Sequence, residues 1–252
     1  MGYNTSAMAQ EPDLEQLIHT GHLEPETYRG YREAFASDPL RIVVLKHILF
    51  DEIAERLSSF MRREAVFKRV CGLYSDAERY GNITDVAEDT WLATDESMRF
   101  YRFGEFDPLR DEYRSSTNYK LFQDFLTLIR SKRFKGFLEG ISGLLFGSTP
   151  VINAYSYGPG DFLALHSDDV RDKRLSFVFY LSPGWERRFG GLLSIGGIDE
   201  SATNLEFEPE YNSLAIFDVT ARTEHQITPV NLSAGQLARV TISGWFLKPD
   251  AA

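Results

Sequence analysis

Residues 151–166 read VINAYSYGPGDFLALH and residues 239–247 read RVTISGWFL. Both stretches are rich in β-branched and aromatic residues and are interrupted or bounded by Gly, Pro or Asp, which is typical of short strands. With the similar runs between them they give seven predicted strands, at 151–157, 161–166, 175–181, 191–195, 213–219, 225–229 and 239–247. No helix-length gap separates these runs, so they predict an antiparallel sandwich or jelly roll rather than parallel βαβ units.

The residues before this β-rich half have a different character. Apolar residues recur at helical spacing over residues 12–36, from residue 51 to about 65, and over 118–129 and 134–146. A β-branched run at 41–50 predicts one strand, whereas the polar stretch 74–95 predicts irregular structure. We therefore expect an α+β protein forming a single compact domain. A flexible tail (1–10) precedes a mainly helical part (11–150), which packs on a jelly-roll core (151–248) and supplies a possible lid.

Composition limits the class of protein. The net charge of −10 and the pI of about 5.1 argue against nucleic-acid binding, which requires basic surfaces. No run of 18 apolar residues occurs and the start lacks a signal-peptide pattern, so we expect neither membrane insertion nor export. The single cysteine, Cys71, lies among apolar residues and is expected to be a buried thiol in a reducing cytoplasm. The sequence predicts no oligomeric state.

Two of the five histidines lie at strand-like runs in the β-rich half. His166 and Asp168 are two positions apart, so a continuing strand points both side chains to the same face. A later strand can bring His225 to the same place. Two nitrogens and one carboxylate oxygen on one side of a metal leave other positions open, an arrangement that suits Fe(II) enzymes. The His-x-Asp pair alone is a weak pattern, because a histidine at a strand end is more often structural.

The run that begins at Arg239 adds a second kind of chemistry. Arg239, Thr241 and Ser243 share one face of a predicted strand, and a guanidinium there can bind a carboxylate with two parallel hydrogen bonds. Tyr180 ends a neighbouring predicted strand and can donate to the same carboxylate, although such a tyrosine is as often core packing. Tyr155 is the next candidate of this type.

Taken in order, these segments resemble the Fe(II)/2-oxoglutarate-dependent dioxygenases of the prolyl 4-hydroxylase-like superfamily. The resemblance covers about residues 150 to 248. It is carried by 153–155 (NAY), 160–163 (GDFL), 166–168 (HSD), 174–181 (RLSFVFYL), 190–192 (GGL), 214–217 (LAIF), His225 and 239–246 (RVTISGWF).

The resemblance implies a double-stranded β-helix, which is a jelly roll, and a specific set of site residues. His166, Asp168 and His225 are implied as iron ligands. Arg239 is implied to bind the distal carboxylate of 2-oxoglutarate with the help of Tyr180 and Thr241, and Tyr155 and Trp245 are implied to line the same pocket. Related halogenases replace the carboxylate ligand with a small residue, so Asp168 favours hydroxylation over chlorination.

The implied activity is hydroxylation of an unactivated C–H bond, with O₂ consumed and succinate and CO₂ released. The substrate is left open between an amino acid or small metabolite, which the lack of an apparent peptide-binding module slightly favours, and a prolyl residue. Arg174 and Arg222 are candidate contacts for a substrate carboxylate.

Two other interpretations remain open. Zn²⁺ also accepts two histidines and a carboxylate, and Glu224 could act as the base of a zinc hydrolase, although Arg239 and Tyr180 then have no role. A non-catalytic jelly-roll protein that binds metal or acts as a sensor is the second alternative. It requires no co-substrate pocket.

Overall fold

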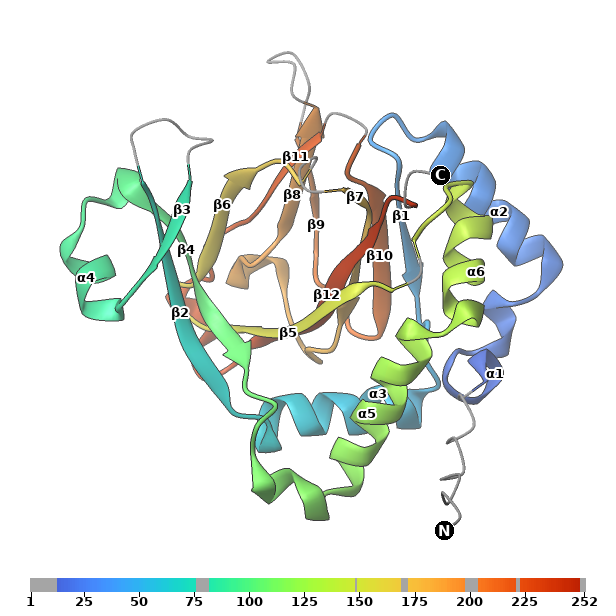
Figure 1. The fold of residues 1–252 in the computed structure, drawn as a ribbon, viewed down its shortest axis with the longest axis horizontal. Coiled ribbons are helices and arrows are strands. Elements are labelled where there is room, and N and C mark those ends of the chain that lie inside the picture. The colour runs from blue at the N-terminus through green and yellow to red at the C-terminus, as the bar shows by residue number, and fades with distance from the viewer. Residues whose placement is uncertain are drawn as a thin grey trace, which may run out of the picture.

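The fold is described from a computed structural model covering residues 13–75, 82–147, 149–168, 172–197, 204–220 and 223–249. The tail predicted at residues 1–10 lies outside these ranges. Most of the helices lie along one side of a strongly curved sheet, whereas α4 (Glu88–Ala93) lies on the opposite side beside β2 (Phe67–Tyr74) (Figure 1).

The elements follow one another along the chain in two blocks. The helices are α1 (Leu14–Leu17), α2 (Pro25–Ser37), α3 (Asp51–Ser59), α4 (Glu88–Ala93), α5 (Thr117–Arg130) and α6 (Lys132–Ser142), and a π-helical turn (Phe60–Glu64) follows α3. The strands are β1 (Ile42–Lys46), β2 (Phe67–Tyr74), β3 (Ile83–Val86), β4 (Arg99–Phe106), β5 (Val151–Tyr157), β6 (Phe162–His166), β7 (Lys173–Tyr180), β8 (Leu193–Gly197), β9 (Leu205–Phe207), β10 (Ser213–Asp218), β11 (Thr223–Ile227) and β12 (Arg239–Leu247).

The strands of the described residues pair antiparallel in the order β1-β10-β7-β12-β5-β4-β6-β11-β8-β9. β2 adds to β4, and β3 adds to β2. The sheet curls so that the β7–β12 side faces the β6–β11–β8 side, and β4 and β5 close one end of the resulting half-barrel (Figure 1). The predicted α+β class and jelly roll are confirmed.

The outer face of β7, β10 and β12 packs against the helices. Phe179 and its alternate neighbours on β7 point outward, and the ring of Phe179 lies 4.9 Å from that of Phe125 on α5 and 6.0 Å from that of Phe134 on α6. Serines begin both helices: the side chain of Ser116 accepts from the backbone of α5, and that of Ser131 accepts from the backbone of α6. The helical layer thus buries one face of the sheet and leaves the other face to line the interior.

The interior of the half-barrel carries a second apolar cluster. Phe103 of β4, Ile195 of β8 and Phe217 of β10 belong to it, together with Tyr157 at the end of β5. The polar side chains of the candidate site adjoin this cluster, since His225 packs against Phe217 and Arg239 against Tyr157.

Three strands in the front half were not predicted. β2 and β4 carry basic residues on both faces, with Lys68 next to Arg69 and Arg99 three residues before Arg102, so they lack a simple apolar alternation. β3 and α4 fall within the stretch 74–95 that was interpreted as irregular. Buried Asp161 explains the charges, because Arg69 of β2 (2.6 Å) and Arg102 of β4 (2.8 Å) both pair with its carboxylate. The interpretation of 74–95 as wholly irregular was therefore wrong.

Two predicted elements are shorter in the structure, for local backbone reasons. The strand expected at 41–50 is confined to Ile42–Lys46, since Arg41 and His47 adopt φ angles of 50° and 53°. The helix expected at 134–146 ends at Ser142, because Gly143 adopts a left-handed C-cap with a φ angle of 70°. Leu144 and Phe146 then join the core as extended chain.

None of the helices in the described ranges is both long enough and apolar enough to cross a membrane. Cys71, predicted to be a buried thiol, is buried in β2 and is not in a disulfide.

We expect Phe179→Ala to lower the free energy of unfolding by about 3–5 kcal/mol, because it removes a buried ring from the joint between α5, α6 and the sheet. Leu145→Ala, at an exposed position, is the matched control and should change stability by less than about 0.5 kcal/mol. Urea unfolding measures both variants, and an equal loss in the two would contradict this account of the core.

Candidate metal centre and anion pocket

Three potential metal ligands meet in the cavity of the half-barrel. His166 ends β6 and pairs directly across the sheet with His225 of β11, which brings their ring centroids to 4.3 Å. Asp168 lies just beyond β6, and one carboxylate oxygen is 3.7 Å from Nε2 of His166 while the other is 3.5 Å from Nε2 of His225. One ligand atom from each residue falls within 4.8 Å of the others.

The histidines present the nitrogens that a metal requires. Nδ1 of His166 lies 2.9 Å from the carbonyl oxygen of Ala164, to which it can donate, so Nε2 is left with its lone pair toward Asp168. Two imidazole nitrogens and one carboxylate oxygen suit a divalent transition metal with positions open to solvent or substrate. The donor set therefore fits Fe(II), and Zn²⁺ is also compatible with it.

Two further side chains hold the carboxylate of Asp168. The ammonium group of Lys173 donates to Oδ1 at 2.6 Å, and the indole N–H of Trp245 donates to Oδ2 at 2.5 Å. Lys173 also lies 3.6 Å from the centroid of the Trp245 ring. Lys173 was not singled out from the sequence, although it directly precedes Arg174, which was.

The electrostatics of the site favour a charged Asp168 and a neutral His225. Burial by itself acts to raise the pKa of Asp168, but His225, His166 and Lys173 outweigh it and hold that pKa below its ordinary value. Burial, reinforced by His166, lowers the pKa of His225 to about 3. A carboxylate and a neutral imidazole are the forms that bind metal ions.

Arg239 lies deeper in the same cavity and has no counter-ion. It is 2% exposed, its Nε has no hydrogen-bond partner, and no carboxylate of the described residues lies within ion-pair distance. The guanidinium carbon lies 5.1 Å from the ring centroid of Tyr157 and 5.2 Å from that of Tyr180. Because a buried charge is costly unless it is paired, this arrangement predicts an anion beside Arg239.

Tyr180 lies beside Arg239 but does not itself line the cavity. Its hydroxyl is buried without a hydrogen-bond partner, and burial raises the pKa of Tyr180, so the hydroxyl stays protonated and can donate. Gly191 leaves room for the arginine stem: a Cβ atom at this residue, whose φ is +65°, would lie 3.0 Å from Cδ of Arg239.

The cavity that joins the two sites has a volume of about 700 Å³. Thr241, Ser243 and Trp245 of β12 line it together with Arg239, as expected for alternate residues of one strand. Tyr155 also lines it, accepts a hydrogen bond from Asn153 at 2.9 Å, and has a pKa raised to about 12 by burial. Tyr157, which faces Arg239, was missed because it reads as one more aromatic residue of a strand.

The two arginines suggested as substrate contacts are not in this group. The side chain of Arg174 donates to Thr220 at 2.9 Å and does not line the cavity. Arg222 lies outside the described residues. Glu224, the possible base of a zinc hydrolase, alternates with His225 along β11 and does not line the cavity either; among the described residues Asp168 is the one carboxylate that does.

Fold and site together define a jelly-roll protein with a candidate metal centre and an anion pocket in one cavity. Residues 152–247 match the sequence profile of the 2OG-Fe(II) oxygenase superfamily. The family predicted from the sequence is confirmed.

The chain resembles known proteins both in sequence and in fold. Prolyl 3-hydroxylase OGFOD1 of Xenopus laevis is 30% identical over 157 residues, which cover 60% of this chain and 29% of that protein. Prolyl 3-hydroxylase sudestada1 of Drosophila melanogaster is 31% identical over 137 residues, or 50% of this chain and 25% of that protein. The chain thus spans less than a third of the length of these relatives.

A crystal structure of a Pseudomonas putida prolyl-4-hydroxylase superposes with a TM-score of 0.55 over 88% of this chain and 98% of that chain, at 17% identity. The shared fold therefore includes the front half of the chain as well as the jelly-roll strands that match the family profile.

We expect Trp245→Phe to weaken the binding of Mn²⁺ or Co²⁺ about tenfold, because the phenyl ring cannot donate to Asp168 and such supporting bonds orient metal ligands. Isothermal titration measures the affinity. Trp91→Phe serves as the matched control, since the indole nitrogen of Trp91 has no hydrogen-bond partner. Unaltered affinity in the Trp245 variant would show that Asp168 does not depend on this bond.

The low pKa of His225 predicts a pH-dependent stability of the metal-free protein. Unfolded His225 takes up a proton below about pH 6.5, whereas folded His225 stays neutral down to about 3, so folding loses stability as the pH falls through this window. The contribution approaches about 1.4 kcal/mol per pH unit. With a chelator present, the unfolding free energy should fall less between pH 6.5 and 4.5 in His225→Gln than in the wild type; parallel curves would refute this.

Proposed function

We propose that this protein is an Fe(II)- and 2-oxoglutarate-dependent oxygenase that hydroxylates a prolyl residue of a protein or peptide. The observation that carries the proposal is the unpaired, buried guanidinium of Arg239 in the same cavity as His166, Asp168 and His225. A zinc hydrolase needs no such anion pocket, and a metal-binding sensor needs no second site.

One group of residues would bind the metal and another would bind the co-substrate. His166, Asp168 and His225 would hold Fe(II), which with 2-oxoglutarate and O₂ supplies the oxidising power of the reaction and yields succinate and CO₂. Arg239 would bind the distal carboxylate of 2-oxoglutarate with two parallel hydrogen bonds, and the protonated Tyr180 would add a third donor. Thr241 lies on the same face of β12 and lines the same pocket.

Neighbouring side chains orient Asp168 and enclose Arg239. Lys173 and Trp245 fix the orientation of Asp168, so that the carboxylate needs little rearrangement when the metal binds. Tyr157 and Tyr180 flank the guanidinium and keep water from it, which strengthens its attraction for a carboxylate. The aromatic side chains Phe100 and Trp245 line the same cavity and offer apolar surface to a prolyl ring.

The choice of a prolyl substrate is supported by the relatives, which are named as prolyl hydroxylases. This proposed substrate replaces the amino acid or small metabolite that the sequence analysis slightly favoured. We place the reaction in the cytoplasm, which is supported by a single buried cysteine outside any disulfide. The acidic net charge of −10 supports a protein or peptide substrate over nucleic acid.

The first test is succinate formation from 2-oxoglutarate by the purified protein with Fe(II), in a screen that compares free amino acids with proline-containing peptides. We expect peptides to stimulate succinate formation and to gain one oxygen on a prolyl residue, as mass spectrometry will show. The loss of all succinate in Asp168→Ala is the control for the metal centre. No succinate from the wild-type protein, or oxidation of free amino acids alone, would refute the proposal.

Arg239→Ala should raise the KM for 2-oxoglutarate about 10- to 100-fold, because hydrogen bonds to a charged group contribute about 1.5–3 kcal/mol each. Arg239→Lys is the matched variant, because it keeps the positive charge but loses the two parallel hydrogen bonds. Its KM for 2-oxoglutarate should lie between those of the wild type and Arg239→Ala. Metal affinity, measured separately with Mn²⁺, should stay within twofold of the wild type. If metal binding were lost instead, Arg239 would not have the assigned role.

A further inference from the structure

The wall of the cavity that faces the proposed metal centre is built by strands outside the matched family segment. Ile83 of β3 and Phe100, Tyr101 and Phe103 of β4 line the cavity on this side. The ring of Phe100 packs edge-on against that of His166, with centroids 5.7 Å apart. β3 pairs with β2 and with no other strand of the described residues, so this wall needs another contact to hold it in place.

Tyr101 provides that contact by crossing an intervening strand. The register aligns Tyr101 of β4 with Gly72 of β2 and Gly72 with Asp85 of β3. The tyrosine ring lies over Gly72, and its hydroxyl donates a hydrogen bond to the carboxylate of Asp85. β3 is thereby tied to β4 by a side chain that spans the strand between them.

Gly72 is what allows this crossing. A Cβ atom at this position would lie 2.5 Å from Cζ of Tyr101 and 2.7 and 2.8 Å from its Cε atoms. These separations are far below van der Waals contact, so any other residue at 72 must displace the ring. The sequence interpretation assigned no role to Gly72, Asp85 or Tyr101.

The ring of Tyr101 also belongs to a row of aromatic contacts that leads into the cavity. Its centroid lies 5.0 Å from that of Phe103, which in turn lies 5.0 Å from Tyr155 and 5.3 Å from Tyr157. Tyr157 faces Arg239. Tyr101 therefore contacts both β3 and the aromatic residues inside the cavity.

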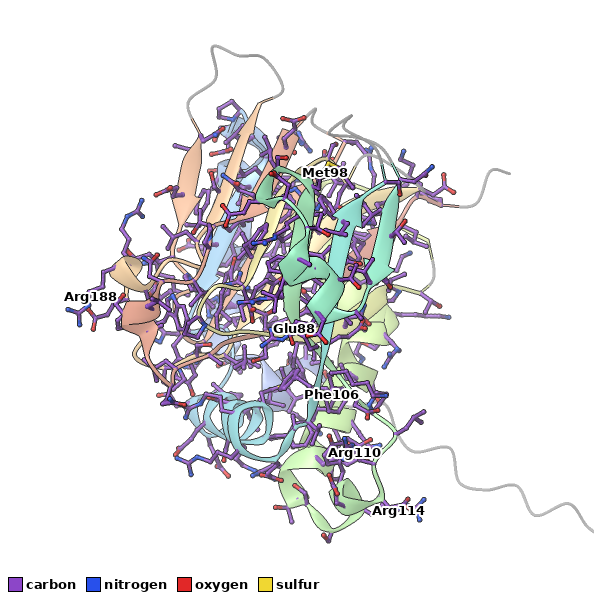
Figure 2. All side chains as sticks on the ribbon, turned by 90° about the vertical axis from the view of Figure 1, so that its left-hand side faces the viewer. Glu88, Met98, Phe106, Arg110, Arg114 and Arg188 are labelled. Carbon is purple, nitrogen blue, oxygen red and sulfur yellow. The ribbon has the colours of Figure 1, made fainter. Side chains whose placement is uncertain are left out.

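Figure 2 looks onto these strands from outside. Met98 lies just before β4 and Phe106 ends it. Glu88 lies between them in front of the strands, where it pairs at 3.7 Å with Arg69 and at 3.8 Å with Arg102. Those ion pairs fasten β2 and β4 on the outer face. The Tyr101–Asp85 bond is the corresponding tie for β3 on the cavity side.

We propose that the hydrogen bond from Tyr101 to Asp85 across Gly72 determines substrate specificity by holding β3 as the wall against which the peptide flanking the prolyl residue packs. The inference rests on the proposed function and names the part of the fold that selects the peptide. Tyr101, Gly72 and Asp85 act as positioning residues: none of them belongs to the candidate ligand set or the anion pocket.

The test compares Tyr101→Phe, Asp85→Ala, Asp85→Asn and the double variant Tyr101→Phe/Asp85→Ala, using the prolyl peptide that most stimulates the wild-type protein. We expect Tyr101→Phe and Asp85→Ala each to raise the KM for the peptide about tenfold, with a smaller rise in the KM for 2-oxoglutarate. The double variant should be no worse than either single variant. Asp85→Asn, whose amide oxygen still accepts, should retain most of the wild-type value. Asp89→Ala, a neighbouring carboxylate on α4, is the matched control.

Hydrogen exchange supplies a readout that does not depend on turnover. The amides of residues 83–86 should exchange about tenfold faster in Tyr101→Phe and in Gly72→Ala than in the wild type, while those of β12 keep their protection. Circular dichroism confirms that each variant is folded before it is compared.

Distinct results overturn the inference. Wild-type peptide affinity in both Tyr101→Phe and Asp85→Ala would show that the bond does not shape the substrate wall. Impaired Asp85→Asn with normal Tyr101→Phe would show that the Asp85 carboxylate contacts the peptide directly, which also overturns the positioning role. A wild-type protein that forms no succinate would instead refute the proposed function, and so separates the two failures.

Discussion

The alternation of side chains along β7 and β12 is the constraint on which the rest of the structure depends. Each strand separates a helix-packed core from a polar cavity, so every second residue must be apolar and the others must suit the site. On β12 this places Val240, Ile242 and Phe246 against the helices and Arg239 and Thr241 in the cavity. A shift of register by one residue would turn the polar residues toward the helices and the apolar residues toward the cavity, and would disrupt both the core and the site.

The same arrangement explains how two charged sites coexist inside the half-barrel. Asp168 stays charged and is paired with Lys173 beside the two histidines, whereas Arg239 in the same cavity is left without a counter-ion. A cavity that holds a negative site near its mouth and an uncompensated cation below it suits a ligand that brings both a metal-binding group and a carboxylate. 2-Oxoglutarate has this combination, which is why the proposed function rests on the pair of sites rather than on the metal ligands alone.

The sequence predicted those parts of the fold well in which the local pattern of residues is compatible with only one type of secondary structure. The β-rich half and the helices α5 and α6 were predicted because apolar spacing and capping residues agree there. β2 and β4 were missed because their charged residues are compensated by Asp161, which is remote in sequence. Arg174, predicted as a substrate contact, lies outside the cavity and Lys173 lines it instead, because an irregularity in the pairing of β7 with β12 changes the alternation at that point.

The sequence by itself determined the family of the jelly roll and the chemistry available to it. The residue types of His166, Asp168, His225 and Arg239 and their order along short strands are visible in the sequence without the fold. Only the tertiary structure decided which further residues join them. Lys173, Tyr157 and the bond between Tyr101 and Asp85 acquire their roles through strand pairing, and pairing across a curved sheet depends on contacts between segments far apart in the chain.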